Sequence, residues 1–142
     1  MRTESWLSEY SVYLAWAIAL VSLVGSVYFA EVLGFPRCLL CWWQDIFMYP
    51  LVFIIGIGIL IKDKAVSVYA LPLSLIGLAI AVYHNLLVWH VISESLAPCT
   101  LGVSCVTQTF TVLNFITIPL LSLVAFALIT FLMAFYGKSN HA

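Results

Sequence analysis

Long apolar stretches without charge alternate with short charged segments along the chain. One uncharged run lies between Glu9 and Glu31, and another reaches the polar turn Lys62–Lys64. A helix needs about 20 mostly apolar residues to cross a bilayer, because each residue rises about 1.5 Å and the hydrocarbon is about 30 Å thick. In lipid such segments must be helical, since an open strand would leave backbone groups unpaired. The pattern predicts four transmembrane helices, at approximately residues 10–31, 43–61, 65–89 and 114–136.

The predicted fold is an all-α, integral membrane four-transmembrane-helix bundle, a single membrane domain over residues 1–142. The chain is 65% hydrophobic and 8% charged, with a mean hydropathy of +1.17. A soluble domain would need far more charge on its surface. The net charge of −1 offers no field that would attract nucleic acid. The first apolar run exceeds the roughly 7–15 residues of a signal-peptide core, so we expect it to be retained.

The lysines and arginines predict the orientation of the bundle. If the spans alternate, Arg2, Lys62, Lys64 and Lys138 share one side of the membrane and only Arg37 lies on the other. Because short cytoplasmic loops carry the excess of Lys and Arg, the termini and the 62–64 turn are expected to be cytoplasmic. The two remaining connections, approximately 34–42 and 90–113, are then extracytoplasmic loops of a multi-pass protein in the cytoplasmic membrane.

All four cysteines fall in these two outer segments. Cys38 and Cys41 form a C-x-x-C pair, and Cys99 and Cys105 are separated by five residues. An extracytoplasmic face is where disulfides persist. The even number and the tight pairing suggest two bridges, 38–41 and 99–105.

The short spacing of each pair favours redox chemistry over structural bridging. A C-x-x-C at the start of a helix places a thiolate near the positive end of the helix dipole, which favours exchange. On the chain-entropy model, a loop of about seven residues stabilises a fold by only about 2 kcal/mol. Two local structural disulfides and a four-thiolate zinc site are the alternatives. An oxidising face and the unequal spacings argue against zinc, and we expect no metal.

A redox relay needs an electron acceptor, and the sequence carries no motif for a soluble one. No dinucleotide-binding fingerprint is present, and no paired haem ligands are evident. A lipid-soluble quinone could be reached from within the bilayer without any sequence motif. Elimination therefore points to a quinone.

Three segments together resemble the DsbB/BdbC family of bacterial quinone-dependent thiol–disulfide oxidoreductases, and its shorter BdbC-like branch in particular. They are FPRCLLCWWQDIFMYP at residues 35–50, the pair Cys99 and Cys105 after Pro98, and NFITIPL at residues 114–120. The likeness covers nearly the whole chain, with four spans in order and a cysteine pair in each outer loop.

The resemblance implies a relay that supports disulfide bond formation in exported proteins. An extracytoplasmic thioredoxin-fold oxidase, DsbA- or BdbD-like, would return as a dithiol and attack the loop disulfide, with Cys99 as its mixed-disulfide partner. Electrons would pass from the Cys99/Cys105 pair to the Cys38/Cys41 pair by thiolate attack on a disulfide. Cys41 would then meet the quinone, which is menaquinone or ubiquinone.

Asp45 departs from the family pattern, which usually has an arginine four residues after the second cysteine of the motif. The i, i+4 spacing puts Asp45 one turn from Cys41. A carboxylate there would oppose a thiolate and a developing quinolate, the reverse of what arginine does. We therefore expect Asp45 to be turned toward water, to be paired, for example with Arg37, or to impair electron transfer to quinone.

His84 is the second candidate for contact with the quinone. It lies roughly 28 Å up the third span from Ala65, and Asp45 lies roughly 24 Å up the second span from Ile61, so the two should sit at similar depth. A histidine at the matching place in the family is associated with the quinone pocket. The alternative is an interfacial histidine that snorkels to water.

Two functions from other classes compete with the relay. One is a non-catalytic four-helix membrane scaffold with two structural disulfides. The other is a transporter, but acidic and basic residues are scarce at mid-bilayer depth, which argues against ion coupling there.

Overall fold

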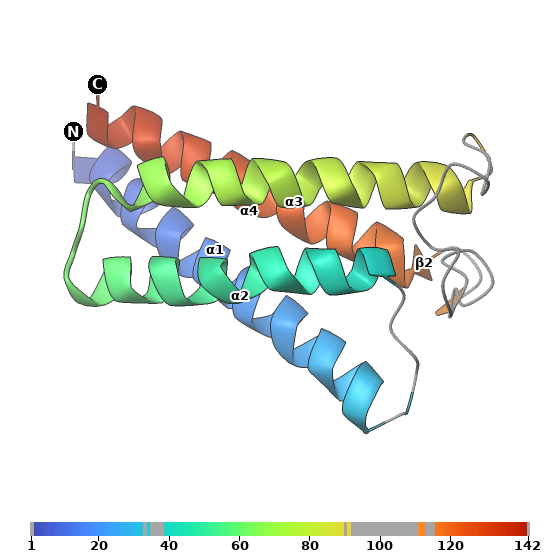
Figure 1. Cartoon of the computed structure of the whole chain (residues 1–142). Helices are drawn as coiled ribbons and strands as arrows, with labels where there is room; N and C mark the ends of the chain where they lie inside the picture. The colour runs from blue at the N-terminus through green and yellow to red at the C-terminus, as the bar shows by residue number, and fades with distance from the viewer. Residues whose placement is uncertain are drawn as a thin grey trace.

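The computed structural model describes residues 2–32, 34, 39–89, 91, 111–112 and 116–141. It confirms the predicted four-helix membrane fold (Figure 1). The helices are α1 (Arg2–Glu31), α2 (Leu39–Leu60), α3 (Val66–Val88) and α4 (Ile118–His141). Each helix contains a segment that is long and apolar enough to cross a membrane: Trp6–Glu31, Leu40–Leu60, Val66–Val88 and Pro119–Asn140.

A short antiparallel strand pair precedes α4, and the sequence pattern did not predict it. Strand β1 (Thr111–Val112) pairs with β2 (Ile116–Thr117), with Thr111 opposite Thr117 and Val112 opposite Ile116. Strand β2 runs directly into α4 at Ile118. Pro119 follows as the second residue of α4, where its missing N–H costs no hydrogen bond.

The helices pack in a closed ring in which each contacts two neighbours. Helix α1 packs on α2 and α4, and α3 packs on α2 and α4. Figure 1 shows that α1 crosses the bundle obliquely, and that both termini and the 61–65 turn lie at one end. The first turn of α2, which contains Cys41, lies at the opposite end. The bundle therefore has a cysteine end and a terminal end.

Close packing inside the bundle depends on small residues. A Cβ added at Gly77 of α3 would collide with the ring of Phe126 on α4, and one added at Gly58 would collide with Val66. Small residues let helix backbones approach in lipid, where packing and hydrogen bonds must hold helices together. The core of the bundle consists of Val12, Ala15, Ala19, Met48, Leu51, Val52, Ile55, Ala70, Ala81, Phe126, Ile129 and Met133.

The outward faces are apolar, as the lipid-facing surface of a membrane bundle must be. Val21, Phe53, Leu60 and Phe131 are each more than 60% exposed. On a soluble protein such a surface would mark an aggregation site or an interface. Here it agrees with lipid as the surrounding solvent.

Candidate functional site

Cys41 lies in the first turn of α2 and is half-buried. It packs against an apolar cluster built on Leu40 and Leu87, together with Ile80 and Tyr83 from α3. Helix α2 begins at Leu39, earlier than the expected start at 43, so Cys41 belongs to the helix and lies near the positive end of its dipole.

The other redox-active candidates lie outside the described residues. These are Cys38, Cys99 and Cys105, and Arg37, the expected partner of Asp45, is also among the residues not described. Both bridges, 38–41 and 99–105, therefore stay predictions.

Exposed tryptophans surround the cysteine end of the bundle. Trp42 and Trp43 directly follow Cys41 and are 55% and 47% exposed, and Trp89 at the end of α3 is 55% exposed. Tryptophan is enriched at membrane–water interfaces, where its ring is apolar and its N–H meets water. This arrangement agrees with a position of Cys41 close to the boundary of the hydrocarbon.

Gln44 and His84 meet between α2 and α3, one turn further into the bundle than Cys41. The Nε2 atom of Gln44 lies 3.3 Å from Nδ1 of His84, and the two residues are 6% and 1% exposed. The alternative of a histidine that snorkels to water is therefore wrong. Which of the two atoms donates depends on the tautomer of the imidazole and on the orientation of the amide.

Asp45 faces the neighbouring helix α1. The Ser26 Oγ atom lies 2.8 Å and 2.9 Å from the two carboxylate oxygens, which share its single proton. Asp45 is only 9% exposed, so the expectation that it turns toward water is wrong. A hydrogen bond to a charged acceptor is roughly twice as strong as a neutral one, which offsets part of the cost of burying the carboxylate.

Asn85, next to His84, connects α3 to the start of α4. Its Nδ2 atom donates to the carbonyl of Ala81 at 2.8 Å and to the carbonyl of Pro119 at 2.9 Å. These two acceptors fix the orientation of the amide and leave Oδ1 buried without a hydrogen-bond partner among the described residues.

Sequence reasoning missed the roles of Asn85 and Gln44. Their signal was available, because an amide inside an apolar span is costly and marks a candidate functional position. Polar contacts thus join the helices in three separate places: Ser26–Asp45 between α1 and α2, Gln44–His84 between α2 and α3, and Asn85 between α3 and α4.

Comparisons with known proteins identify disulfide bond formation proteins as relatives of this chain. The family model described as "Disulfide bond formation protein DsbB" matches residues 8–136. The "Probable disulfide formation protein C 2" of Bacillus cereus is 41% identical over 128 residues, covering 90% of this chain and 91% of its own length. The "Disulfide bond formation protein C" of Bacillus subtilis is 43% identical over 121 residues, covering 85% and 88%.

A third relative comes from another genus. The "Probable disulfide formation protein" of Deinococcus radiodurans is 41% identical over 131 residues, covering 86% of this chain and 85% of its own length. No solved structure matches the chain. The match over most of the chain and the identities near 40% show that this protein belongs to the DsbB family of disulfide bond formation proteins.

Proposed function

We propose that this protein is a membrane thiol–disulfide oxidoreductase that reoxidises an extracytoplasmic thioredoxin-fold oxidase and transfers the electrons to a quinone. One observation carries the proposal. A cysteine at the N-terminal turn of a transmembrane helix packs one turn above the buried pair Gln44–His84, at the tryptophan-rich end of the bundle. Family membership supports the disulfide chemistry, and it does not favour the alternative of a non-catalytic scaffold.

The proposed relay conserves electrons and protons at each exchange. The partner dithiol becomes a disulfide as the Cys99–Cys105 bridge opens to two thiols. These thiols form their bridge again as the Cys38–Cys41 disulfide opens. Each exchange moves two electrons and two protons, through thiolate attack on a sulfur and departure of the other thiolate. A bound quinone would supply the acceptor for these two electrons and two protons.

The residues around Cys41 have the chemistry that a quinone ring requires. A quinone presents two carbonyl oxygens on an apolar ring, so it needs hydrogen-bond donors in apolar surroundings. Gln44 carries an amide N–H₂ and His84 a ring N–H, and Leu40, Leu87 and Tyr83 supply apolar surface nearby. We propose that Cys41 and His84 hold the quinone, with Gln44 fixing the imidazole through Nδ1.

Asp45 acts differently in this proposal from the arginine that the family pattern predicts. Its carboxylate is engaged by Ser26 on the side of α1, whereas His84 approaches α2 from α3. We propose that Asp45 is not a quinone ligand and that the hydrogen bond from Ser26 keeps its carboxylate turned toward α1. Its charge still disfavours negative charge on the sulfur, which slows electron transfer.

The orientation of the bundle is part of the proposal. The cysteine end faces outward and the terminal end faces the cytoplasm, because the described lysines Lys62, Lys64 and Lys138 gather at the terminal end. After reduction, a membrane-impermeant thiol reagent applied to intact cells should label all four cysteines. Labelling of either pair only after cell disruption would contradict the orientation.

A trapping experiment separates the relay from the scaffold. In a Cys105→Ser variant, Cys99 should hold a mixed disulfide with the thioredoxin-fold partner, visible as an adduct on non-reducing gels that disappears with dithiothreitol. A Cys99→Ser variant serves as the matched control and should give no such adduct. Equal adducts in the two variants, or none in either, would overturn the assignment of Cys99.

A further inference from the structure

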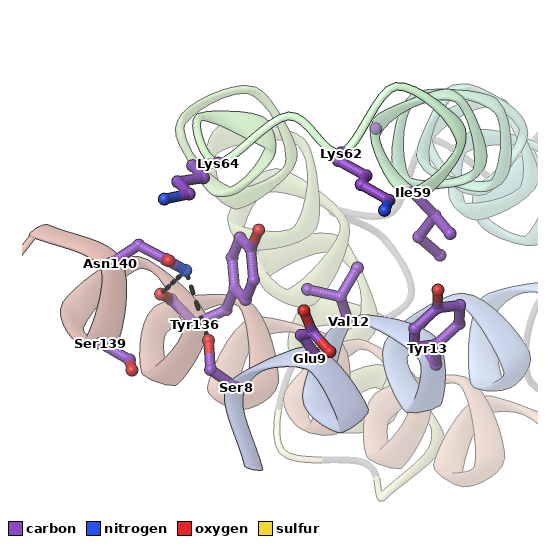
Figure 2. Close-up of a pocket in the computed structure, with 11 residues that line it drawn as sticks. Ser8, Glu9, Val12, Tyr13, Ile59, Lys62, Lys64, Tyr136, Ser139 and Asn140 are labelled. Carbon is purple, nitrogen blue, oxygen red and sulfur yellow. Dashed lines mark hydrogen bonds between the residues drawn. The ribbon is translucent and has the colours of Figure 1, made fainter. Parts of the chain in front are cut away.

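A pocket of about 510 Å³ opens at the terminal end of the bundle, away from Cys41 (Figure 2). Its walls come from three separate parts of the chain: Ser8, Glu9, Val12 and Tyr13 of α1, Gly58, Ile59, Lys62 and Lys64 around the 61–65 turn, and Tyr136, Ser139 and Asn140 of α4. Small-molecule sites typically have volumes of about 300–1,000 Å³. The redox relay makes no use of this pocket.

Two lysines give the pocket its charge. Figure 2 shows the side chains of Lys62 and Lys64 reaching from the turn toward α1 and α4, with Glu9 on the opposite wall. Two lysines against one glutamate leave the lining with a net charge of +1. Asp63, between the lysines, does not line the pocket and accepts a hydrogen bond from the Ala65 N–H at 2.9 Å.

The backbone holds Lys62 in a conformation that glycine normally occupies. Its φ is +54°, in the left-handed region. The Asp63 N–H donates to the Gly58 carbonyl at 2.9 Å and the Lys62 N–H donates to the Ile59 carbonyl at 3.3 Å. This is the Schellman arrangement that ends a helix, and its left-handed position usually carries glycine because a side chain is strained there. The chain thus places a lysine at a position where glycine would be more stable.

Neutral polar groups complete the lining. Asn140 donates from Nδ2 to the Ser8 hydroxyl at 3.3 Å and to the Tyr136 carbonyl at 3.0 Å, joining α1 to α4 beneath the lysines. The Tyr136 hydroxyl donates to the Asp63 carbonyl at 3.4 Å. The hydroxyls of Ser139 and Tyr13 also line the pocket. Ammonium and hydroxyl groups around one cavity are hydrogen-bond donors of the kind that bind a phosphate group.

The surroundings of the pocket are those of a membrane interface. A smaller pocket of about 220 Å³ adjoins it and shares Glu9 and Tyr13, with Trp6 and Tyr10 as its other walls. The side chains of Trp6, Tyr10 and Tyr13 are each more than half exposed. Leu14 and Val21 continue an exposed apolar face along α1. Interfacial aromatic residues lie at the level of lipid headgroups. A ligand with a phosphate and an acyl chain therefore matches both the pocket and the adjoining face.

We propose that this pocket binds the phosphate group of an anionic phospholipid from the leaflet on the side of the termini, with Lys62 and Lys64 as its cationic ligands. The acyl chains then lie against the exposed face of α1. A soluble phosphate ester has the same headgroup chemistry but lacks the acyl chains. The site contains no cysteine, so this proposal does not depend on the proposed redox function.

The binding test uses the full-length protein in detergent micelles and native mass spectrometry. Phosphatidylglycerol and phosphatidylcholine are offered in equal amounts, and retention of each lipid is measured. Phosphatidylglycerol should be retained preferentially. The Lys62→Gly variant should retain it about fivefold less, because one lysine near an anionic lipid surface is worth about 1 kcal/mol. Glycine suits the left-handed position, so this variant should fold at least as stably as the parent.

Two further variants make the test specific. Glu9→Gln removes the opposing charge and should increase retention of phosphatidylglycerol. Lys138→Ala removes an exposed lysine from the same end that does not line the pocket, and it should leave retention unchanged. Equal losses in the Lys62→Gly and Lys138→Ala variants would overturn the site, since they would indicate diffuse charge attraction. An unchanged Lys62→Gly variant would also overturn it.

A competition arm distinguishes the two sources of phosphate. Inorganic phosphate and glycerol phosphate are titrated against bound phosphatidylglycerol at constant ionic strength. Displacement only at concentrations far above that of the lipid supports a phospholipid site. Complete displacement by equimolar glycerol phosphate would overturn the phospholipid assignment in favour of a soluble phosphate ester.

Discussion

The Nε2 atom of Gln44 lies 3.3 Å from Nδ1 of His84, and both side chains are buried between α2 and α3 just below Cys41. This contact joins the helix that carries the C-x-x-C motif to the helix that faces it. Because Gln44 precedes Asp45, the contact also agrees with the similar depth of Asp45 and His84 that residue counting predicts. The contact with the amide holds the imidazole in one orientation.

Replacing Gln44 by leucine should slow quinone reduction without slowing oxidation of the partner. Loss of the amide removes one hydrogen bond to a buried nitrogen, at a cost of about 1 kcal/mol in stability. The imidazole is then held less firmly. The first turnover with partner dithiol, followed by gel shift, should keep its rate, while steady-state quinone absorbance changes fall several-fold. Gln44→Met, which keeps the length of the side chain and carries no hydrogen-bond donor, should behave like leucine. Equal slowing of both steps would contradict this role.

Removing the charge of Asp45 should accelerate quinone reduction. Asp45→Asn keeps a hydrogen-bond partner for Ser26 and eliminates a carboxylate one turn from Cys41. The repulsion relieved is on the order of 1 kcal/mol, or about fivefold in rate. Steady-state quinone reduction measures the effect.

Ser26→Ala is the matched control for the charge argument. It removes the hydroxyl that binds the buried carboxylate, so it should lower the melting temperature and should not accelerate the reaction. If Asp45→Asn reduced the rate, the carboxylate would have a positive role and the electrostatic argument would be wrong.

Asn85 should be essential for the docking of α4 against α3. Asn85→Leu removes the bond from Nδ2 to the Pro119 carbonyl, which lies at the first turn of α4. The Pro119 carbonyl still accepts from the Ser122 hydroxyl at 2.8 Å, so the change removes one hydrogen bond between the helices, worth about 1 kcal/mol. Thermal unfolding in detergent should show the loss. A melting temperature equal to that of the parent would mean that this hydrogen bond contributes nothing to stability.

Two glycines offer a matched test of helix packing. Gly77→Ala would drive a methyl group into the ring of Phe126, whereas Gly25 has nothing within 4 Å of an added Cβ. The first change should destabilise the bundle by about 1–3 kcal/mol, and Gly25→Ala should be neutral or slightly stabilising. Adding Phe126→Leu to Gly77→Ala should recover part of the loss. Equal effects of the two alanine substitutions would argue against close packing of α3 on α4.

The spacing of charged residues predicts the four spans well, because each span must be mostly apolar over about 20 residues, and the second span contains a single charged residue, Asp45. The facing of individual side chains is harder to predict. In a soluble helix the apolar stripe marks the buried face, but here lipid-facing and core-facing positions are both apolar. The sequence therefore could not indicate that Asp45 faces Ser26 on α1 while Gln44 faces His84 on α3.

Local backbone geometry was the other unpredictable part. The left-handed conformation of Lys62 at the end of α2 goes against the preference for glycine, and it brings a lysine to the terminal-end pocket. The β1–β2 pair involves two residues from each strand, too few to produce a recognisable alternation. By contrast, the cysteine spacing and the motif at residues 35–50 identify the family without any structure.

The coupling of thiol oxidation to quinone reduction tests the central claim most directly. Purified protein is mixed with excess reduced thioredoxin-fold partner and a soluble quinone analogue, and partner disulfide and quinone absorbance are measured together. We expect one quinone to be reduced for each partner disulfide formed, and no quinone reduction with Cys41→Ser. Partner oxidation without quinone consumption, or full quinone reduction by the Cys41→Ser variant, would contradict it.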